Sequence, residues 1–186
     1  NHEGKVLDET YKMMRLIATT IRPYTIADLP RVREIFINWN RQITPSGLEA
    51  PFESYIQKSL VEEIECIPDY YGGRGSGFWV VEFCGIVAGM AGLERLTNDK
   101  VEVRRMYVAE EFRRRGIGAM LLGHLESWAK AFGYRQIVLS TSELQPQAKN
   151  LYESRGYELA REEVAQSQTN RTVGGGIRRF YFEKWL

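Results

Sequence analysis

Hydrophobic residues recur along this chain with two alternating periods, one typical of strands and one typical of helices. Residues 18–22 form a β-branched run that predicts a strand ended by Pro23. Residues 25–39 place apolar side chains at helical spacing, and residues 51–67 repeat that spacing until Pro68. The N-terminal part is therefore expected to fold as one strand followed by two helices.

Three strand-like runs come next. A glycine-dense, aromatic-flanked segment at residues 69–77 predicts a loop. β-Branched and aromatic runs follow at 78–83 and 86–96, and a short turn at 84–85 divides them. A third run spans residues 100–108. Together these runs predict a meander of antiparallel strands.

The third of these runs changes its alternation once. Its apolar residues sit first at Val101 and Val103 and then at Met106 and Val108, so the two-residue period slips between the pairs. One extra residue near positions 104–105 explains the slip, because a β-bulge shifts the alternation by one and bends the strand. Burial of both strand faces is the alternative.

The C-terminal half predicts two more helices and three more strands. An amphipathic helix ends at Gly133, and a short helix begins at Pro146. The remaining elements are an apolar strand at 136–141, a strand from Tyr157, a polar loop at 163–176 and a strand at 177–186. The order favours an α/β (α+β) fold in which helices flank a mostly antiparallel sheet of about six or seven strands. Residues 16–186 are expected to form one domain, preceded by a disordered or non-native tail at 1–15.

The overall charge adds a constraint. Lys and Arg total 25 against 24 Asp and Glu, which gives a formal net charge of +1. This balance creates no global field to recruit nucleic acid or an anionic membrane, so any anion site must be local. No apolar run approaches the roughly 20 residues that cross a bilayer, and the first residues lack the apolar segment of a secretory signal. The sequence therefore predicts a cytoplasmic protein without a nucleic-acid or membrane partner.

The cysteines and histidines give little material for metal binding. Cys66 and Cys84 are widely spaced, and His2 and His124 are the two histidines. This set argues against a disulfide framework and against a metal site. His124 is expected in the middle of a helix, as a solvated or capped side chain.

The segment EEFRRRGIGAMLL, residues 110–122, is the strongest candidate for a local anion site. Gly116 and Gly118 lie between a strand and a helix, where free backbone N–H groups and the positive end of the helix dipole converge. Leu121 stands where a dinucleotide fingerprint needs its third glycine, and no Gly-Lys-Ser/Thr of a P-loop follows. The alternatives are a simple turn, a solvated arginine face or a contact with nucleic acid.

Two spaced motifs resemble one known family. Arg113, Gly116 and Gly118 match its hallmark at the start of a helix, and a second motif downstream is matched by Ala148, Tyr152, Gly156 and Tyr157. The chain thus resembles the GCN5-related N-acetyltransferase (GNAT) superfamily from about residue 17 to its C-terminus. The resemblance implies splayed central strands and acetyl-coenzyme A as acyl donor, with no metal.

The resemblance also implies where the cofactor binds. Main-chain groups around the glycines would hold the pyrophosphate, namely those of Arg114, Arg115, Gly116, Ile117, Gly118 and Ala119. The pantetheine arm would meet main-chain groups of Met106, Tyr107 and Val108. Arg113 is the motif arginine, and Arg114 and Arg115 would supply auxiliary charge. Gln145 replaces the usual asparagine beside the cofactor arm, and Asn150 is the residue expected to compensate.

The expected reaction is direct transfer of the acetyl group to a primary amine, which must lose a proton to attack. Glu102 is the candidate general base, and an ion pair with an arginine is its alternative role. The Val108 N–H is the expected donor to the oxyanion. Tyr152 matches the family's general acid, and its alternative role is a core tyrosine.

The acceptor is the least defined part. The two N-terminal helices and the loops at 69–77 and 166–176 are expected to form its variable walls. Aromatic side chains there either line a pocket or pack in the core, namely Trp39, Phe52, Tyr55, Tyr70 and Tyr71. Ser140 stands where amino-terminal acetyltransferases often carry a glutamate, which argues against ribosomal-protein substrates. The amine of a small molecule or peptide is the expected substrate, a non-catalytic acetyl-coenzyme A sensor is the alternative, and a homodimer stays open.

Overall fold

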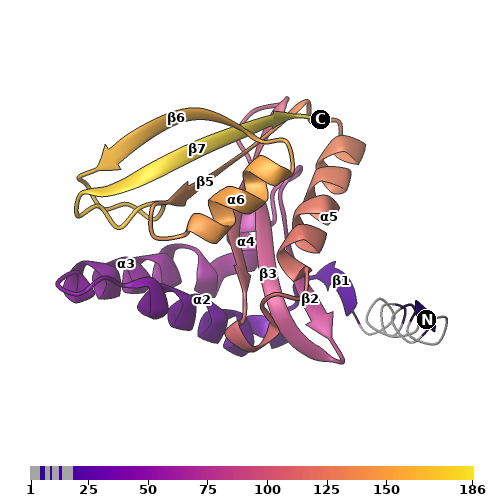
Figure 1. Cartoon of the computed structure of the whole chain (residues 1–186), viewed down its shortest axis with the longest axis horizontal. Coiled ribbons are helices and arrows are strands. Elements are labelled where there is room, and N and C mark those ends of the chain that lie inside the picture. The colour runs from indigo at the N-terminus through magenta and orange to yellow at the C-terminus, as the bar shows by residue number, and fades with distance from the viewer. Residues whose placement is uncertain (1–4, 7–8, 10–12, 14–18) are drawn as a thin grey trace.

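The computed structural model describes residues 5–6, 9, 13 and 19–186. The predicted tail at 1–15 therefore falls largely outside the described residues. In the described part, helices flank a mixed sheet of seven strands (Figure 1), as the sequence predicts.

The sheet has the order β1-β2-β3-β4-β5-β7-β6. Its strands are β1 (Thr19–Pro23), β2 (Gly77–Phe83), β3 (Ile86–Arg95), β4 (Lys100–Val108), β5 (Gln136–Ser142), β6 (Glu158–Ala165) and β7 (Ile177–Trp185). Neighbouring strands run antiparallel except β4 and β5, which are parallel. A long crossover through a helix joins this parallel pair, as parallel strands require.

The helices are α2 (Leu29–Ile43), α3 (Glu49–Glu62), α4 (Ile67–Tyr71), α5 (Ile117–Phe132) and α6 (Pro146–Ser154). Short 3₁₀ turns occur at Ile26–Asp28, Ile64–Cys66 and Glu110–Phe112. The α5 helix ends at Gly133, which has the predicted left-handed conformation with φ of 106°.

Several predicted boundaries are wrong; the loop expected at 69–77, for example, begins only after α4 ends at Tyr71. The helix expected at 51–67 ends at Glu62, and Pro68 lies in the first turn of α4 instead of ending a helix. Proline suits that position because its φ is already helical and its missing N–H would have had no partner there. The loop expected from residue 163 begins only after Ala165, because β6 continues as an exposed edge strand whose polar residues hide its pattern.

Two helical layers cover the two faces of the sheet. On β3, a Cβ added at Gly89 would meet Ile117 and Leu121 of α5, and one added at Gly92 would meet Tyr71 of α4. The α6 helix lies beside α5, since a Cβ added at Gly118 would lie 3.5 Å from the Leu151 side chain. Helices α5 and α6 therefore cover one face, and α2 to α4 cover the other.

The predicted bulge is present in β4. Gly92 of β3 pairs with Arg104, whereas Met90 pairs with Tyr107, so β4 holds one residue more than β3 between these pairs. Arg105 is the residue with φ of 53°. This left-handed conformation is strained for a non-glycine residue, so surrounding contacts must hold it in place.

The parallel pair separates soon after it forms. Strand β4 pairs with β5 only over Lys100–Glu102 and Gln136–Val138. Beyond that point β5 continues to pair with β7, and β4 keeps only its β3 partner. The two central strands thus diverge, as the family resemblance implies, and expose main-chain groups along the edge of β4.

Candidate functional site

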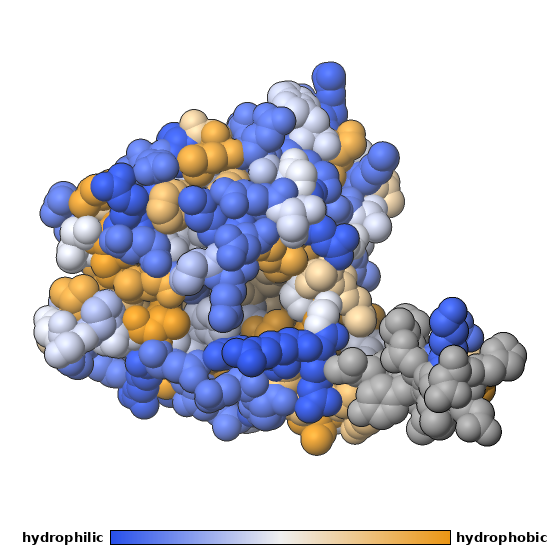
Figure 2. All heavy atoms as spheres, viewed as in Figure 1, coloured by the Kyte–Doolittle hydropathy of each residue, from blue (hydrophilic) through white to orange (hydrophobic). Residues whose placement is uncertain are grey.

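A cleft of about 640 Å³ opens where β4 and β5 diverge. Figure 2 shows this side of the molecule hollowed between the α2 and α3 layer and the part formed by α6 and β5 to β7. One end of the cleft is formed by Arg113–Ala119 before and within α5, and is called the α5 end. The other is called the arginine end, after Arg104, Arg105, Arg171 and Arg179 in its wall.

The α5 end is built from main-chain groups. Arg114 and Gly116 have positive φ angles of 60° and 78°, which turn the chain sharply before the helix. No side chain of the described residues caps the N-terminus of α5. The first N–H groups of the helix therefore remain as donors at the positive end of its dipole, as an anion site requires.

The three consecutive arginines have different environments. The Arg113 guanidinium lies 4.2 Å from the centre of the Trp39 ring, and its Nε donates to the Val108 carbonyl at 3.2 Å. Arg114 lines the cleft. The Arg115 side chain instead packs over Phe83 and Phe112, and Arg115 is not among the residues that line the cleft. The structure thus brings Arg113 and Arg114 to the site and leaves the Arg115 side chain outside it.

Val108 presents its main chain to the cleft. It lies opposite Gly89, and at the next pair the Ala109 N–H donates to the Ala88 carbonyl at 2.8 Å. Hydrogen-bonded and non-bonded pairs alternate along antiparallel strands, so the Val108 N–H and C=O point away from β3. The contact from Arg113 to the Val108 carbonyl agrees with this direction. The Val108 N–H is therefore a main-chain donor on the splayed side of β4.

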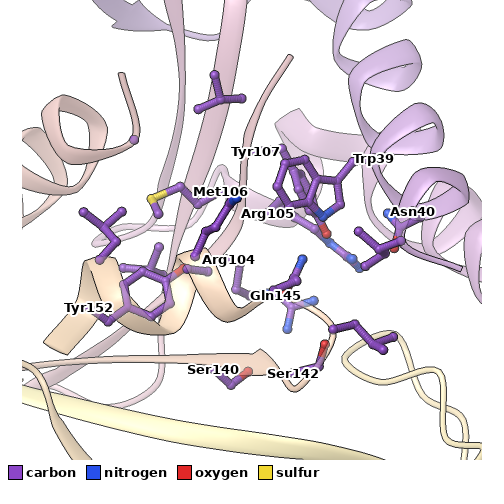
Figure 3. A pocket seen from close by; sticks show the side chains of 18 of the residues that line it. Trp39, Asn40, Arg104, Arg105, Met106, Tyr107, Ser140, Ser142, Gln145 and Tyr152 are labelled. Carbon is purple, nitrogen blue, oxygen red and sulfur yellow. The ribbon is translucent and has the colours of Figure 1, made fainter. Parts of the chain in front are cut away.

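Tyr152 of α6 reaches the same region. Figure 3 shows it in the cleft with Met106 of β4 on one side and Ser140 of β5 on the other. Its ring packs 6.0 Å from those of Tyr157 and Phe182. Burial raises the pKa of the Tyr152 hydroxyl well above its ordinary value, and the nearby Tyr107 adds to the rise. The hydroxyl is consequently protonated at neutral pH and available as a proton donor.

Glu102 lies between two arginines. Its Oε2 accepts from Arg171 at 2.9 Å and lies 3.9 Å from the nearest nitrogen of Arg104. The ion pair considered as the alternative from the sequence is thus present. Its Oε1 has no hydrogen bond to the described residues, so a base function for Glu102 stays a prediction.

A buried ion cluster holds the bulge, and the sequence did not reveal it. Glu63, which follows α3, is fully buried and accepts from Arg104 and from Arg105 at 2.6 Å each. Tyr71 also donates its hydroxyl proton to Glu63, and Tyr55 accepts from Arg105 at 2.8 Å. These bonds link α3 and α4 to the strained residue of β4.

The electrostatics of Glu63 follow from this cluster. Burial alone raises the pKa of its carboxyl, but the charge of Arg105 and the hydrogen bonds from both arginines outweigh burial and lower the pKa to about 2. Glu63 is therefore ionised at neutral pH. A buried charge of this kind is tolerated because it is fully paired.

The loop between β6 and β7 closes the arginine end. The Asn170 carbonyl accepts from Arg105 at 2.7 Å, and Arg171 donates to Glu94 at 2.8 Å as well as to Glu102. The sequence predicted this loop as a wall but did not identify its anchors. Their partners lie about seventy residues away in the chain, so no local pattern shows them.

The remaining predicted residues divide into two groups. Met106, Tyr107, Gln145 and the aromatic residues Trp39, Phe52 and Tyr55 line the cleft. Gln145 accepts at its Oε1 from Thr141 at 2.9 Å. Outside the lining lie Tyr70 and Tyr71, which pack on each other, and Asn150, which is exposed on α6. The structure does not bring Asn150 to the position expected for a contact with the cofactor arm.

Three further observations concern the described residues. None of their helices is both long and apolar enough to cross a membrane. No group of three or more His, Cys, Asp or Glu among them is arranged to hold a metal ion. His124 is half-buried and packs against Trp79 with ring centres 5.6 Å apart; its Nε2 is buried without a hydrogen-bond partner in this part of the chain, so this nitrogen is neither solvated nor capped.

Comparison with known proteins agrees with this geometry. The pattern of the acetyltransferase (GNAT) family matches residues 35–157. Human N-acetyltransferase 8 is 31% identical over 113 residues, which are 58% of this chain and 50% of that protein. N-acetylaspartate synthetase of Danio rerio is 35% identical over 106 residues, 56% of this chain and 38% of that protein. The chain thus spans about half, or less, of the length of these relatives.

The same fold occurs among solved structures. The PaiA N-acetyltransferase from Thermoplasma acidophilum, in complex with coenzyme A, superimposes with a TM-score of 0.69 at 22% identity. The match covers 90% of this chain and 99% of the other. Similarity at this level of identity shows a shared fold.

Proposed function

The chain belongs to the acetyltransferase (GNAT) family, and from that premise we propose that it transfers an acetyl group from acetyl-coenzyme A to the primary amine of a small molecule or peptide. One observation carries the proposal: a single cleft holds an uncapped helix N-terminus at one end and the protonated Tyr152 hydroxyl further along. An anion site and a proton donor are the two groups that coenzyme A chemistry needs.

The residues at the α5 end fit coenzyme A. The positive φ angles of Arg114 and Gly116 turn the chain just before α5, a backbone geometry that allows successive N–H groups to converge on a diphosphate. Arg114 adds a cation in the lining, and the exposed edge of β4 from Met106 to Val108 offers donors and acceptors to an amide-bearing arm. When bound, acetyl-coenzyme A supplies the thioester: a C–N bond forms to the amine as the C–S bond breaks, and one net proton passes from nitrogen to sulfur.

Residues of the chain would assist at two atoms. The Tyr152 hydroxyl is buried and protonated, so it can give its proton to the departing sulfur. The Val108 N–H points into the splay, where it can donate to an acyl oxygen that gains charge. Glu102 is the candidate to receive the amine proton through its unbonded Oε1, either directly or through water.

A thiol-release assay tests the proposal. Native protein with acetyl-coenzyme A should release coenzyme A in the presence of at least one member of a panel of amino acids, peptides and polyamines. Tyr152→Phe should reduce turnover by about 100-fold, within the usual range for loss of a general acid. Its affinity for coenzyme A, measured by calorimetry, should stay nearly native, because main-chain N–H groups at the α5 end, and not this hydroxyl, would hold the phosphates.

Tyr24→Phe is the matched control. The Tyr24 hydroxyl is also buried, has no hydrogen-bond partner in the described chain and lies outside the cleft lining. Its loss should leave turnover unchanged. Native turnover in Tyr152→Phe would remove this hydroxyl from the mechanism. Tight coenzyme A binding without turnover of any amine would instead favour a non-catalytic sensor.

A further inference from the structure

The arginine end contains more positive charge than its carboxylates neutralise. Arg104, Arg105 and Arg171 form ion pairs with the carboxylates of Glu63, Glu94 and Glu102. The three guanidinium charges are therefore balanced by the three carboxylate charges. Arg179, a fourth arginine in the same wall, is not part of this network.

Arg179 has an incomplete set of partners. It lies on β7 opposite Ser142 of β5, and one of its terminal nitrogens donates to Ser140 Oγ at 2.7 Å. Its Nε is buried and has no hydrogen-bond partner among the described residues. Within the same part of the chain, no carboxylate lies within ion-pair distance. A guanidinium has five donors, so most of those on Arg179 remain available.

The acidic residue next to Arg179 on the adjacent strand already accepts hydrogen bonds from other side chains. Glu163 lies opposite Arg179 on β6. One of its oxygens accepts from the Tyr181 hydroxyl and the other accepts from Arg161 at 2.7 Å. Glu163 therefore accepts no hydrogen bond from Arg179; the hydrogen bonds from Tyr181 and Arg161 lower the pKa of its carboxyl most, and the charge of Arg179 contributes less.

The Arg179 side chain lies on the face of the sheet opposite α6. Side chains of directly paired residues share a face, so Arg179 shares one with Ser142 and, two residues along β5, with Ser140. Phe182, three residues further along β7 and therefore on the opposite face, is buried against Tyr152 of α6. Arg179 thus approaches the splay from the face opposite α6, where an acceptor could meet the thioester without crossing the cofactor.

We propose that Arg179, with the hydroxyls of Ser140 and Ser142, binds a carboxylate of the acceptor, so that the substrate class is an amine that also carries a carboxylate, with an amino acid as its simplest form. This inference rests on the proposed acetyl transfer. A guanidinium matches a carboxylate through two parallel hydrogen bonds, and both serines line the same wall. The apolar side chains of Val173 and Ile177 beside it offer contact to the rest of the substrate.

Matched substrates test the inference. The assay compares methionine and phenylalanine with their amides and with the amines that lack the carboxyl group, at saturating acetyl-coenzyme A. Native protein should use the acids with at least about tenfold higher kcat/KM. Arg179→Gln should lower kcat/KM for the acids by about 10- to 100-fold, mainly through KM, and leave the amides unchanged; Arg179→Lys should restore part of the loss.

Arg178→Gln is the matched control. Arg178 is the adjacent arginine on β7, is exposed, pairs with Glu162 on β6 and lies outside the cleft lining. The Arg178→Gln variant should keep the native ratio of kcat/KM for the acids to kcat/KM for the amides. A purely structural role for Arg179 would lower turnover of acids and amides equally and would overturn the inference.

The outcomes separate this inference from the proposed function. Amides used as well as acids would overturn the carboxylate site and leave the acetyltransferase proposal intact. If no amine is used, methionine and methionine amide are titrated into the coenzyme A-loaded protein by calorimetry. Binding of the acid alone, lost in Arg179→Gln, would support the site; equal or absent binding would reject it.

Discussion

The two ends of the cleft are built in opposite ways. The α5 end consists mainly of main-chain N–H groups from one continuous segment, shaped by the left-handed turn at Gly116. The arginine end consists of side chains from β4, β7 and the loop between β6 and β7, held by a glutamate that follows α3. The first depends on local backbone conformation, and the second depends on contacts that form only in the folded chain.

This difference predicts how each end responds to mutation. Main-chain donors survive most side-chain changes, so the α5 end should fail only where a residue blocks the turn. The arginine end relies on buried charges, and a buried charge that loses its partner is costly. Changes there should therefore affect stability as well as substrate use.

The largest expected effect comes from Glu63→Gln. The change keeps the side-chain shape but leaves Arg104 and Arg105 buried without their shared anion. It should lower the free energy of unfolding by about 3–5 kcal/mol, as measured by urea denaturation. Under conditions where the variant remains folded, coenzyme A affinity should change by less than about threefold, because the α5 end shares none of these contacts.

Glu62→Gln provides the control for this comparison. Glu62 is the preceding residue, is exposed and pairs with Lys58 one helical turn away. The Glu62→Gln variant should keep the native free energy of unfolding, because exposed ion pairs contribute little to it. A Glu63→Gln variant as stable as Glu62→Gln would contradict the account of the arginine end.

Lowering the pH is expected to have a smaller effect on the free energy of unfolding. The pKa of Glu63 is about 2 in the folded chain and near its ordinary value when unfolded, so the unfolded state binds the proton more readily. The stabilisation is complete above about pH 5 and falls as the pH approaches the folded pKa, with roughly 1 kcal/mol lost by about pH 3.5. Urea denaturation at several pH values measures this loss. The slope should be shallower in Glu63→Gln, and an equal slope would exclude Glu63 as its source.

The sequence showed the α5 end because its determinants are local. Gly116, Gly118 and the apolar stripe of the next helix lie within one segment, and the parity slip at Val103 and Met106 correctly located the bulge. Each of these patterns reflects backbone geometry that the nearby residues impose.

The arginine end could not be predicted in the same way. Glu63 lies in the sequence next to exposed glutamates, and only the tertiary fold distinguishes it from Glu62. Arg179 follows another arginine on an alternating strand, so the sequence does not show which one enters the cleft. The helical spacing of apolar residues also missed the break after Glu62, because Ile64 is apolar and buried in the 3₁₀ turn as it would be in a continued helix.

Calorimetric titration of coenzyme A tests the central claim most directly, namely that the main chain around Gly116 holds the cofactor. Gly118→Ala is the matched control, because a Cβ there meets only the Leu151 side chain at an ordinary 3.5 Å. Gly116→Glu forces a side chain onto a φ of 78° and adds negative charge beside the phosphates. Binding to native protein and to Gly118→Ala, with a loss of about 100-fold or more in Gly116→Glu, is the predicted result. Native affinity in Gly116→Glu, or no binding to the native chain, would contradict it.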